Sequence, residues 1–314
     1  MVRKGDYKRD QRAGTVRVAG AAQQPDGKAV YLDNFGPMTR LTRGTQLKIQ
    51  DMQNLYAQSD YSGKFEAWGV KHAVLAGVDY AQEKRQVYSA LTAAQGGVNL
   101  TKPNTSVGTP NDGAWIDEGS RVLRVGNEYV SKGWGVYGQD LVQVAPDWKI
   151  LGGLRYDSMT GDYDTFNAAT GAVTGSYRMK VSEWSKRFGV LYQPSPLHSF
   201  HFSYGTSFNT SGEAYSLGAA NVNTPPESSE NLELGARIES ADKKFTSRVA
   251  LFKSTKKHER NTDPLLPGIT VLSGKRHVAG IDADIAGYIT PQWEVFGSYM
   301  WMPTAKIDIG AQSA

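Results

Sequence analysis

Hydrophobic and polar positions alternate with a period of two in several runs of the chain. In residues 198–209 the even positions are mainly aromatic and the odd positions are polar. Residues 148–157, 230–239 and 279–285 alternate in the same way. Because successive side chains of a strand point to opposite faces, each run predicts a strand with one apolar and one polar face. Helical spacing fits none of these runs.

The connections between these runs alternate between tight and long. Tight turns are expected at residues 144–148, 193–198, 240–244 and 289–293. Long stretches rich in Gly, Asn, Thr and Ser cover residues 91–128, 161–178, 209–228 and 257–273. An outer-membrane β-barrel has short turns at its periplasmic end and long loops at its outer end. The pattern therefore predicts an all-β fold: an antiparallel meander of about 10–11 long strands, part of a transmembrane β-barrel.

The same alternation also fits a half-buried antiparallel sheet in a soluble protein. The strands run to about 10–15 residues, longer than the 5–6 of a typical globular strand. Their polar face carries many charges, which a dry core would not accommodate. Aromatic residues near the expected strand ends suit the girdles of a barrel. These are Trp134, Trp148, Tyr192, Tyr288, Trp293 and Trp301.

A barrel assigns the two faces to different surroundings. The apolar set is expected on the convex, lipid-facing side: Trp148, Ile150, Leu154, Phe200, Phe202, Tyr204, Leu232, Leu234 and Ile238. The charged set is expected to point into the concavity: Lys149, Arg155, Glu233, Arg237, Asp282 and Asp284. Since side chains alternate, a slip of one residue would invert a whole strand.

Composition narrows the function classes. Mean hydropathy is −0.46, and no apolar run approaches the roughly 20 residues of a membrane helix. The chain has no cysteine, which excludes disulfides, thiolate metal sites and a cysteine nucleophile. The net charge of +4 is spread along the chain and indicates no nucleic-acid partner.

Six strings carry a resemblance to a known family. They are AGVDY at 76–80, GVYGQD at 135–140, LGGLRYD at 151–157, GVLYQP at 189–194, FSYGTSF at 202–208 and PESSENLELGAR at 226–237. In this order and spacing they resemble the barrel of TonB-dependent outer-membrane receptors, specifically the siderophore-receptor branch, over residues 70–302. The last string is the most specific.

The resemblance implies that residues 1–314 are a partial TonB-dependent receptor β-barrel domain, roughly the middle half of a barrel of about 22 strands. The plug domain, the TonB box and the C-terminal strands are expected to be absent, and the start does not read as a signal peptide. The implied function is binding and import of a ferric siderophore in the Gram-negative outer membrane. The implied partners are the siderophore, outer-membrane lipid and TonB, the last through the absent plug. A passive porin-like channel and a soluble β-rich structural or adhesive module remain as alternatives.

No catalytic constellation is found in the sequence. The five histidines lack a metal-binding spacing, and no serine lies in a G-x-S-x-G elbow. We therefore expect no enzyme activity, no cofactor and no protein ligand to a metal, because the siderophore itself wraps the iron. Ligand contacts are expected in the outer loops, where the alternative is ordinary solvated residues. The candidates are Trp115, Arg121, Arg124, Tyr129, Tyr177, Arg178, Tyr215, Lys257 and Arg260.

Overall fold

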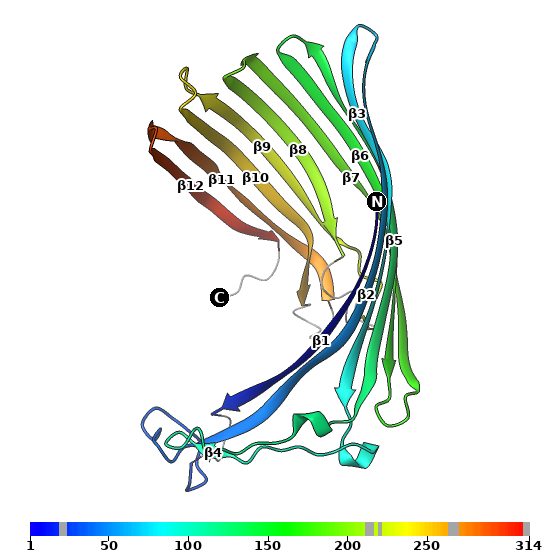
Figure 1. Cartoon of the computed structure of the whole chain (residues 1–314), viewed down its shortest axis with the longest axis vertical. Coiled ribbons are helices and arrows are strands. Elements are labelled where there is room, and N and C mark those ends of the chain that lie inside the picture. Colours follow the sequence, from blue (N-terminus) through cyan, green and yellow to red (C-terminus); the bar gives the residue numbers. More distant parts are fainter. Residues whose placement is uncertain (19–23, 211–216, 219–221, 263–269, 310–314) are drawn as a thin grey trace.

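The computed structural model describes residues 1–18, 24–210, 217–218, 222–262 and 270–309. Within them eleven strands form one antiparallel sheet, and each pairs with its neighbours in sequence, as predicted. The sheet curves into an open trough (Figure 1). The strands are β1 (Val2–Arg17), β2 (Arg40–Ala67), β3 (Val70–Ala90), β5 (Leu123–Ala145), β6 (Trp148–Phe166), β7 (Val173–Ser195), β8 (His198–Asn209), β9 (Glu227–Glu239), β10 (Phe245–Thr262), β11 (Thr270–Thr290) and β12 (Trp293–Ile309).

The remaining elements are short and lie in the connection between β3 and β5. Strand β4 (Thr105–Ser106) pairs with β2 outside the main path. The 3-10 turns η1 (Ala93–Gln95) and η2 (Glu118–Ser120) have three residues each. No helix in the described ranges is long and apolar enough to cross a membrane.

The strands are longer than the sequence predicted. Strand β2 has 28 residues and β7 has 23. Much of the stretch 161–178 was expected to be loop, but β6 and β7 pair through it and leave only residues 167–172 between them. The expectation was wrong because the convex face of this stretch carries polar residues, which in the sequence indicate a loop. The two strands nevertheless stay hydrogen-bonded to each other there.

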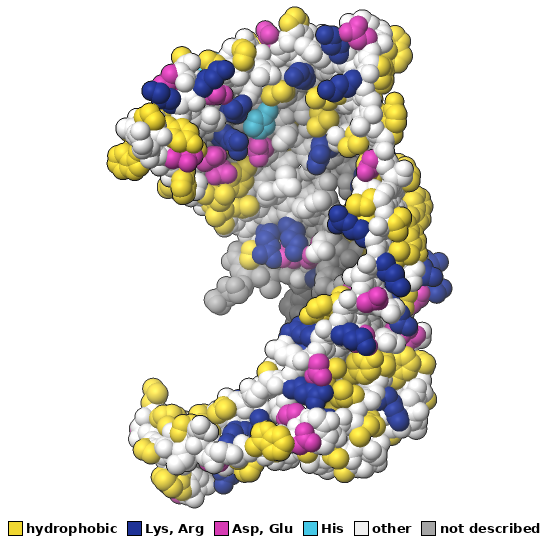
Figure 2. Space-filling model, in the orientation of Figure 1, with side chains coloured by type: hydrophobic (Ala, Val, Ile, Leu, Met, Phe, Trp, Pro, Cys, Tyr) yellow, Lys and Arg dark blue, Asp and Glu magenta, His cyan; other side chains and the backbone are white. Residues whose placement is uncertain are grey.

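The convex face carries continuous apolar rows that cross the sheet. In one row each residue is the cross-strand partner of the next: Val142, Ile150, Val190, Phe202, Leu234, Leu251, Ile281 and Trp301. Leu154 and Leu234 are more than half exposed. Figure 2 shows hydrophobic side chains along the convex outline and charged ones inside the hollow. The predicted division between the two faces is confirmed.

Two aromatic rows border this convex surface. Near the short turns, the rings of Trp148 and Tyr192 stack with centroids 4.5 Å apart. Further along the strands, Tyr156 lies 5.5 Å from Trp134 and 5.0 Å from Trp184. Trp134 and Trp301 do not lie at strand ends as expected, because β5 and β12 continue well past them.

The concave face holds charged side chains that are paired across strands. Arg155 on β6 donates to Asp79 on β3 (Nη1–Oδ2, 2.6 Å) and to Asp157 (Nη2–Oδ1, 2.6 Å). The backbone of Gly135 on β5 lies directly beneath the guanidinium, where a Cβ would collide with it. Charge-assisted pairing of this kind allows a polar face to remain ordered without a dry core.

The polarity of the two faces inverts partway along β6 and β7. From Trp148 to Tyr156, the apolar side chains of β6 point to the convex side. Beyond that point Asp162 and Arg178 lie on the convex face, and Tyr163 and Tyr177 lie on the concave face. The pairing has no register shift between these positions. The inversion therefore reflects a change in the surroundings of the two faces and not a slip of the strand. The convex apolar segment is nine residues long, close to the roughly 9–11 that cross a bilayer.

The sheet has two open edges. Among the described strands, β1 pairs only with β2, and β12 pairs only with β11. Because the path contains eleven antiparallel strands, β1 and β12 run in the same direction. These two edges therefore cannot join each other in the antiparallel pairing of an outer-membrane barrel.

Candidate functional site: the concave face near the long loops

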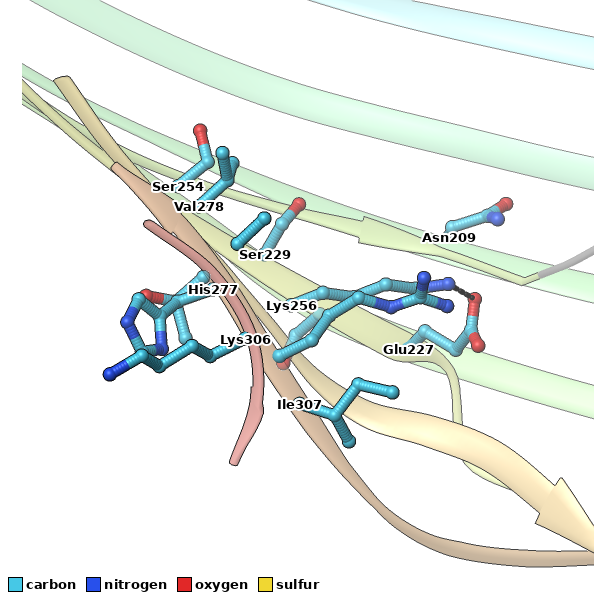
Figure 3. Close-up of a pocket in the computed structure, with 13 residues that line it drawn as sticks. Asn209, Glu227, Ser229, Ser254, Lys256, His277, Val278, Lys306 and Ile307 are labelled. Carbon is cyan, nitrogen blue, oxygen red and sulfur yellow. Dashed lines mark ion pairs between the residues drawn. The ribbon is translucent and has the colours of Figure 1, made fainter. Parts of the chain in front are cut away.

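A hollow of about 530 Å³ lies on the concave face, near the ends of β8–β12 that lead into the long connections. Lys256 on β10 lies within it. Its Nζ is 2.9 Å from Oε2 of Glu227 and 3.6 Å from Oε1 of Glu259. Figure 3 shows Lys256, Glu227 and Ile307 on one side of the sheet, with His277 and Lys306 pointing away from them.

The charges of this hollow are balanced among themselves. Arg276 on β11 donates from Nε to Oε2 of Glu259 at 2.7 Å. Glu227 and Glu259 are buried, with 6% and 9% of their surface exposed. Buried carboxylates need such partners, because an unpaired buried charge is costly. The hollow therefore offers hydrogen-bonding groups to a ligand and little surplus charge.

An aromatic patch forms a second part of the concave face. Its buried members are Tyr129, Tyr163, Met179, Val181 and Leu217, and Met159, Tyr177 and Phe208 pack against them. Tyr129 comes from β5, Tyr163 from β6 and Met179 from β7. The ring of Tyr129 lies across Gly161, where a Cβ would be 2.7 Å from its hydroxyl. Tyrosine and methionine side chains offer flat, polarisable surface for aromatic or chelate ligands.

The longest connection, residues 91–122, is fixed to the sheet by the pair of Arg43 with Asp112 and is held internally by the pair of Arg121 with Glu118. Arg43 on β2 donates to both oxygens of Asp112, at 2.7 and 2.9 Å. The hydrogen bonds from Arg43 lower the pKa of Asp112 to about 2. Arg121 binds Glu118 at 2.5 Å and, as the main cause, lowers the pKa of that carboxyl. These contacts leave Trp115 79% exposed at the surface of the connection.

The structure does not bring the predicted site residues into one cluster. Tyr129 and Tyr177 join the aromatic patch. Arg178 and Lys257 lie on the convex face, paired with Asp162 (2.5 Å) and Glu230 (2.6 Å). Tyr215 lies outside the described residues.

The three remaining arginines hold loops in place. Arg121 pairs with Glu118, as described above, and Arg124 donates to the carbonyl of Ala168 at 2.8 Å. Arg260 donates from its backbone N–H to Glu227 at 3.2 Å and from Nη2 to the carbonyl of Thr210 at 3.4 Å. Each guanidinium or amide is therefore engaged within the protein.

Sequence reasoning found Tyr129 and Tyr177 but missed the methionine and valine members of the patch. Met159, Met179 and Val181 alternate with polar residues, as Tyr177 does. The signal was present as an inverted alternation, apolar on the odd positions of β7 at 177–181 and apolar on the even positions at 184–192. Glu227, Glu259 and Arg276 gave no such signal, because ion pairs between distant strands have no local pattern.

Three of the five histidines are each paired with one carboxylate. His72 lies 2.6 Å from Asp140, His201 lies 2.7 Å from Glu233, and His277 lies 2.8 Å from Asp308. Among the residues that the structure describes, no group of three histidine or carboxylate side chains could hold a metal ion. These pairs are consistent with ordering of the sheet across strands.

Comparisons with known proteins identify the family to which this architecture belongs. The family model "TonB dependent receptor-like, beta-barrel" matches residues 4–313. The catecholate siderophore receptor Fiu of Escherichia coli K12 is 24% identical over 281 residues, which are 80% of this chain and 35% of the relative. The probable TonB-dependent receptor BfrD of Bordetella pertussis is 28% identical over 171 residues, 52% of this chain and 23% of the relative.

Solved structures show the same fold. The closed form of the E. coli ferric-catecholate import receptor Fiu superposes with a TM-score of 0.81 at 20% identity, covering 99% of this chain and 45% of that one. The siderophore receptor PiuA of Acinetobacter baumannii gives 0.73 at 20% identity, with 88% and 41% covered. The chain thus spans about a quarter to a third of the curated relatives. Because the family model covers almost its whole length, the chain belongs to the TonB-dependent receptors and forms part of their outer-membrane β-barrel.

Proposed function

We propose that this chain forms the wall and outer rim of a receptor that binds a ferric siderophore and imports it with TonB-coupled energy. The observation that carries the proposal is the family match over residues 4–313. Relatives named as siderophore receptors support it. In this account the plug and the TonB contact are supplied by parts of a receptor outside this chain.

The aromatic patch and the charged hollow are the ligand-contacting surfaces in this proposal. Both lie on the concave face toward the long loops, where a ligand entering from outside would arrive. Tyr129, Tyr177 and Trp115 offer rings to an aromatic chelate. Arg121, Arg124 and Arg260 act indirectly by fixing the loops around the entrance, and Tyr215 remains a candidate contact.

No resident cofactor and no catalytic step belong to this proposal. The iron is cargo, enclosed by the siderophore. The family consists of transport receptors, and the paired charges of the concave face offer no activated nucleophile.

The proposal is tested by binding and uptake of a ferric catecholate labelled with radioactive iron, in receptor-deficient cells that produce a complete receptor in which this chain forms part of the barrel. Tyr163→Ala on the concave face removes one ring of the patch and should weaken binding about three- to tenfold, the range expected for one aromatic contact. Tyr156→Ala, on the convex face of the same strand, is the matched control and should leave binding unchanged. Receptor levels in the outer membrane are compared for every variant.

Deletion of TonB separates this function from the alternative of a passive channel. The account predicts that binding survives the deletion and that uptake is lost. Uptake that persists without TonB would instead show porin-like diffusion, and binding that Tyr163→Ala leaves unchanged would exclude the patch as a ligand surface.

A further inference from the structure

A hollow of about 890 Å³ opens on the convex face over the middle of β6, and we call it the wall hollow. Its floor is the backbone of Gly138 on β5 and Gly152 on β6, where an added Cβ would meet no atom within 4 Å. Apolar and aromatic side chains form most of its rim: Val136, Leu154, Trp184, Phe188 and Tyr204. Gly152 lies between Trp148 and Tyr156, which belong to the two aromatic rows. The wall hollow therefore faces the hydrocarbon layer.

Two opposite charges lie beside the wall hollow, one on each strand that flanks β6. Asp140 on β5 is the cross-strand partner of Gly152, and Lys186 on β7 is the partner of Leu154. This register places both charges on the convex face, within the segment that contacts lipid. Charged side chains are rare at this depth, and each one is a functional candidate.

Neither charge is fully satisfied within one copy of the chain. Oδ2 of Asp140 lies 2.6 Å from Nδ1 of His72 on β3. Within the part of the chain that the structure describes, Oδ1 of Asp140 and Nε2 of His72 are buried and have no hydrogen-bond partner. In the same described ranges Lys186 belongs to no ion pair, and its side chain is exposed. Because unpaired polar groups are costly in hydrocarbon, the wall hollow favours a partner that supplies both an anion and a cation.

A second copy of this chain supplies both, because the wall hollow is complementary to itself. A twofold axis along the membrane normal through β6 keeps both copies inserted the same way and exchanges the positions of β5 and β7. Asp140 of each copy then faces Lys186 of the other copy. The two positions differ by two residues along the strands, about 7 Å, which a lysine side chain spans. Gly138 and Gly152 remove the side chains that would otherwise hold the two walls apart.

We propose that two copies of the receptor associate side by side in the outer membrane, with β6 on the twofold axis and reciprocal Asp140–Lys186 pairs in the wall hollow. Strand β6 is an interior strand of the sheet. Strands that complete the barrel would attach at the open edges of β1 and β12 and would leave this surface uncovered. The interface lies on the opposite side of the sheet from the ligand-contacting surfaces, so the inference does not depend on the proposed function.

The test uses a photo-crosslinker in the outer membrane of cells that co-produce two complete receptors with different epitope tags, each with this chain in its barrel. Leu154→p-benzoylphenylalanine places the probe at the rim of the wall hollow. Leu251→p-benzoylphenylalanine on β10 is the matched control, because the two leucines are 54% and 51% exposed on the same convex face. Irradiation should give a product that carries both tags from position 154 and only background from position 251.

Charge reversal separates pairing between copies from pairing within one copy. Either D140K or K186D, present in both tagged receptors, places like charges opposite each other and should reduce the doubly tagged product about tenfold. Co-production of D140K in one tagged receptor with K186D in the other places two lysines opposite two aspartates. This mixed pair should restore the product, whereas pairing within one copy would not.

Equal products from positions 154 and 251 would overturn the proposal. Crosslinks from position 154 only to lipid, or only to proteins without a receptor tag, would overturn it as well, because something else would then occupy the wall hollow. A mixed pair that stays at the level of the single variants would also contradict it. Where a reversed charge lowers the amount of receptor in the outer membrane, D140N and K186Q are used instead, and an unchanged product from both would overturn the proposal.

Discussion

Single residues on the two faces of this sheet follow different rules. On the concave face, glycines lie beneath large polar side chains of the neighbouring strand, as Gly135 does beneath Arg155 and Gly77 beneath Tyr137. On the convex face, large apolar side chains stand exposed, as Leu234 does with 56% of its surface accessible. Period-two alternation made the convex set predictable. Which glycine lies beneath which ring or guanidinium depends on the register between neighbouring strands. That register cannot be obtained from the sequence alone.

Arginine at position 234 probes the convex face directly. Leu234→Arg places a charge in the middle of an apolar row and should lower the free energy of unfolding by about 2–4 kcal/mol in a bilayer. Asn231→Arg, on the concave face of the same strand, is the control and should cost far less, because its side chain faces water. Denaturant titrations in lipid vesicles give both values. Equal costs for the two variants would contradict lipid exposure of Leu234.

At the scale of elements, the strands were predictable in type but not in length. The tight turns and the runs between them were found because alternation and turn residues are local signals. The strand ends near the long loops were missed because β6 and β7 keep their pairing while their polarity inverts. For a related reason, the candidate site was predicted correctly in some of its residues but not in their location. Tyr129 and Tyr177 were chosen as loop residues, but they belong to the strands that form the wall.

The connection 91–122 should detach in acid. Its anchor is the pair between Arg43 and Asp112, whose pKa of about 2 lies below its usual value of 3.8. A lowered pKa in the folded state means that ionised Asp112 favours the attached loop. This contribution is complete above about pH 4 and is lost as the pH falls toward 2. Limited proteolysis with pepsin across this range should show cleavage of the connection increasing as the pH falls.

Arg43→Gln should produce the detached loop already at neutral pH, read as faster trypsin cleavage within residues 91–122. Lys28→Gln is the control, because its exposed pair with Asp26 lies in another connection. Equal cleavage of Arg43→Gln and wild type would show that the remaining contacts to the sheet, including the hydrogen bond from Thr45 on β2 to Glu118, are sufficient to hold the loop.

At the scale of the whole molecule, the open edges determine how the isolated chain behaves. Within the part of the chain that the structure describes, the outer edges of β1 and β12 present unpaired N–H and C=O groups. The two strands run in the same direction, so they cannot close on each other in antiparallel pairing. In water an exposed apolar face with open edges favours aggregation. In hydrocarbon each unsatisfied group costs several kcal/mol.

The 314-residue chain produced alone should therefore form inclusion bodies and should not restore iron uptake to a receptor-deficient strain. Analytical ultracentrifugation of the detergent-free refolded material is the measurement, with the same material in detergent as the control. A soluble monomer with a cooperative thermal transition would contradict this account of the edges.

The central claim is that the convex face contacts lipid along a short segment of the strands and that, in β6 and β7, the two faces exchange polarity beyond this segment. Because the chain has no cysteine, single cysteines at each position of residues 148–165 can carry a nitroxide in the membrane-embedded receptor. The account predicts high accessibility to oxygen at the even positions from 148 to 156. From position 160 onward the even positions should instead be accessible to a water-soluble nickel complex. Uniform accessibility along β6, or oxygen accessibility at the odd positions, would contradict the claim.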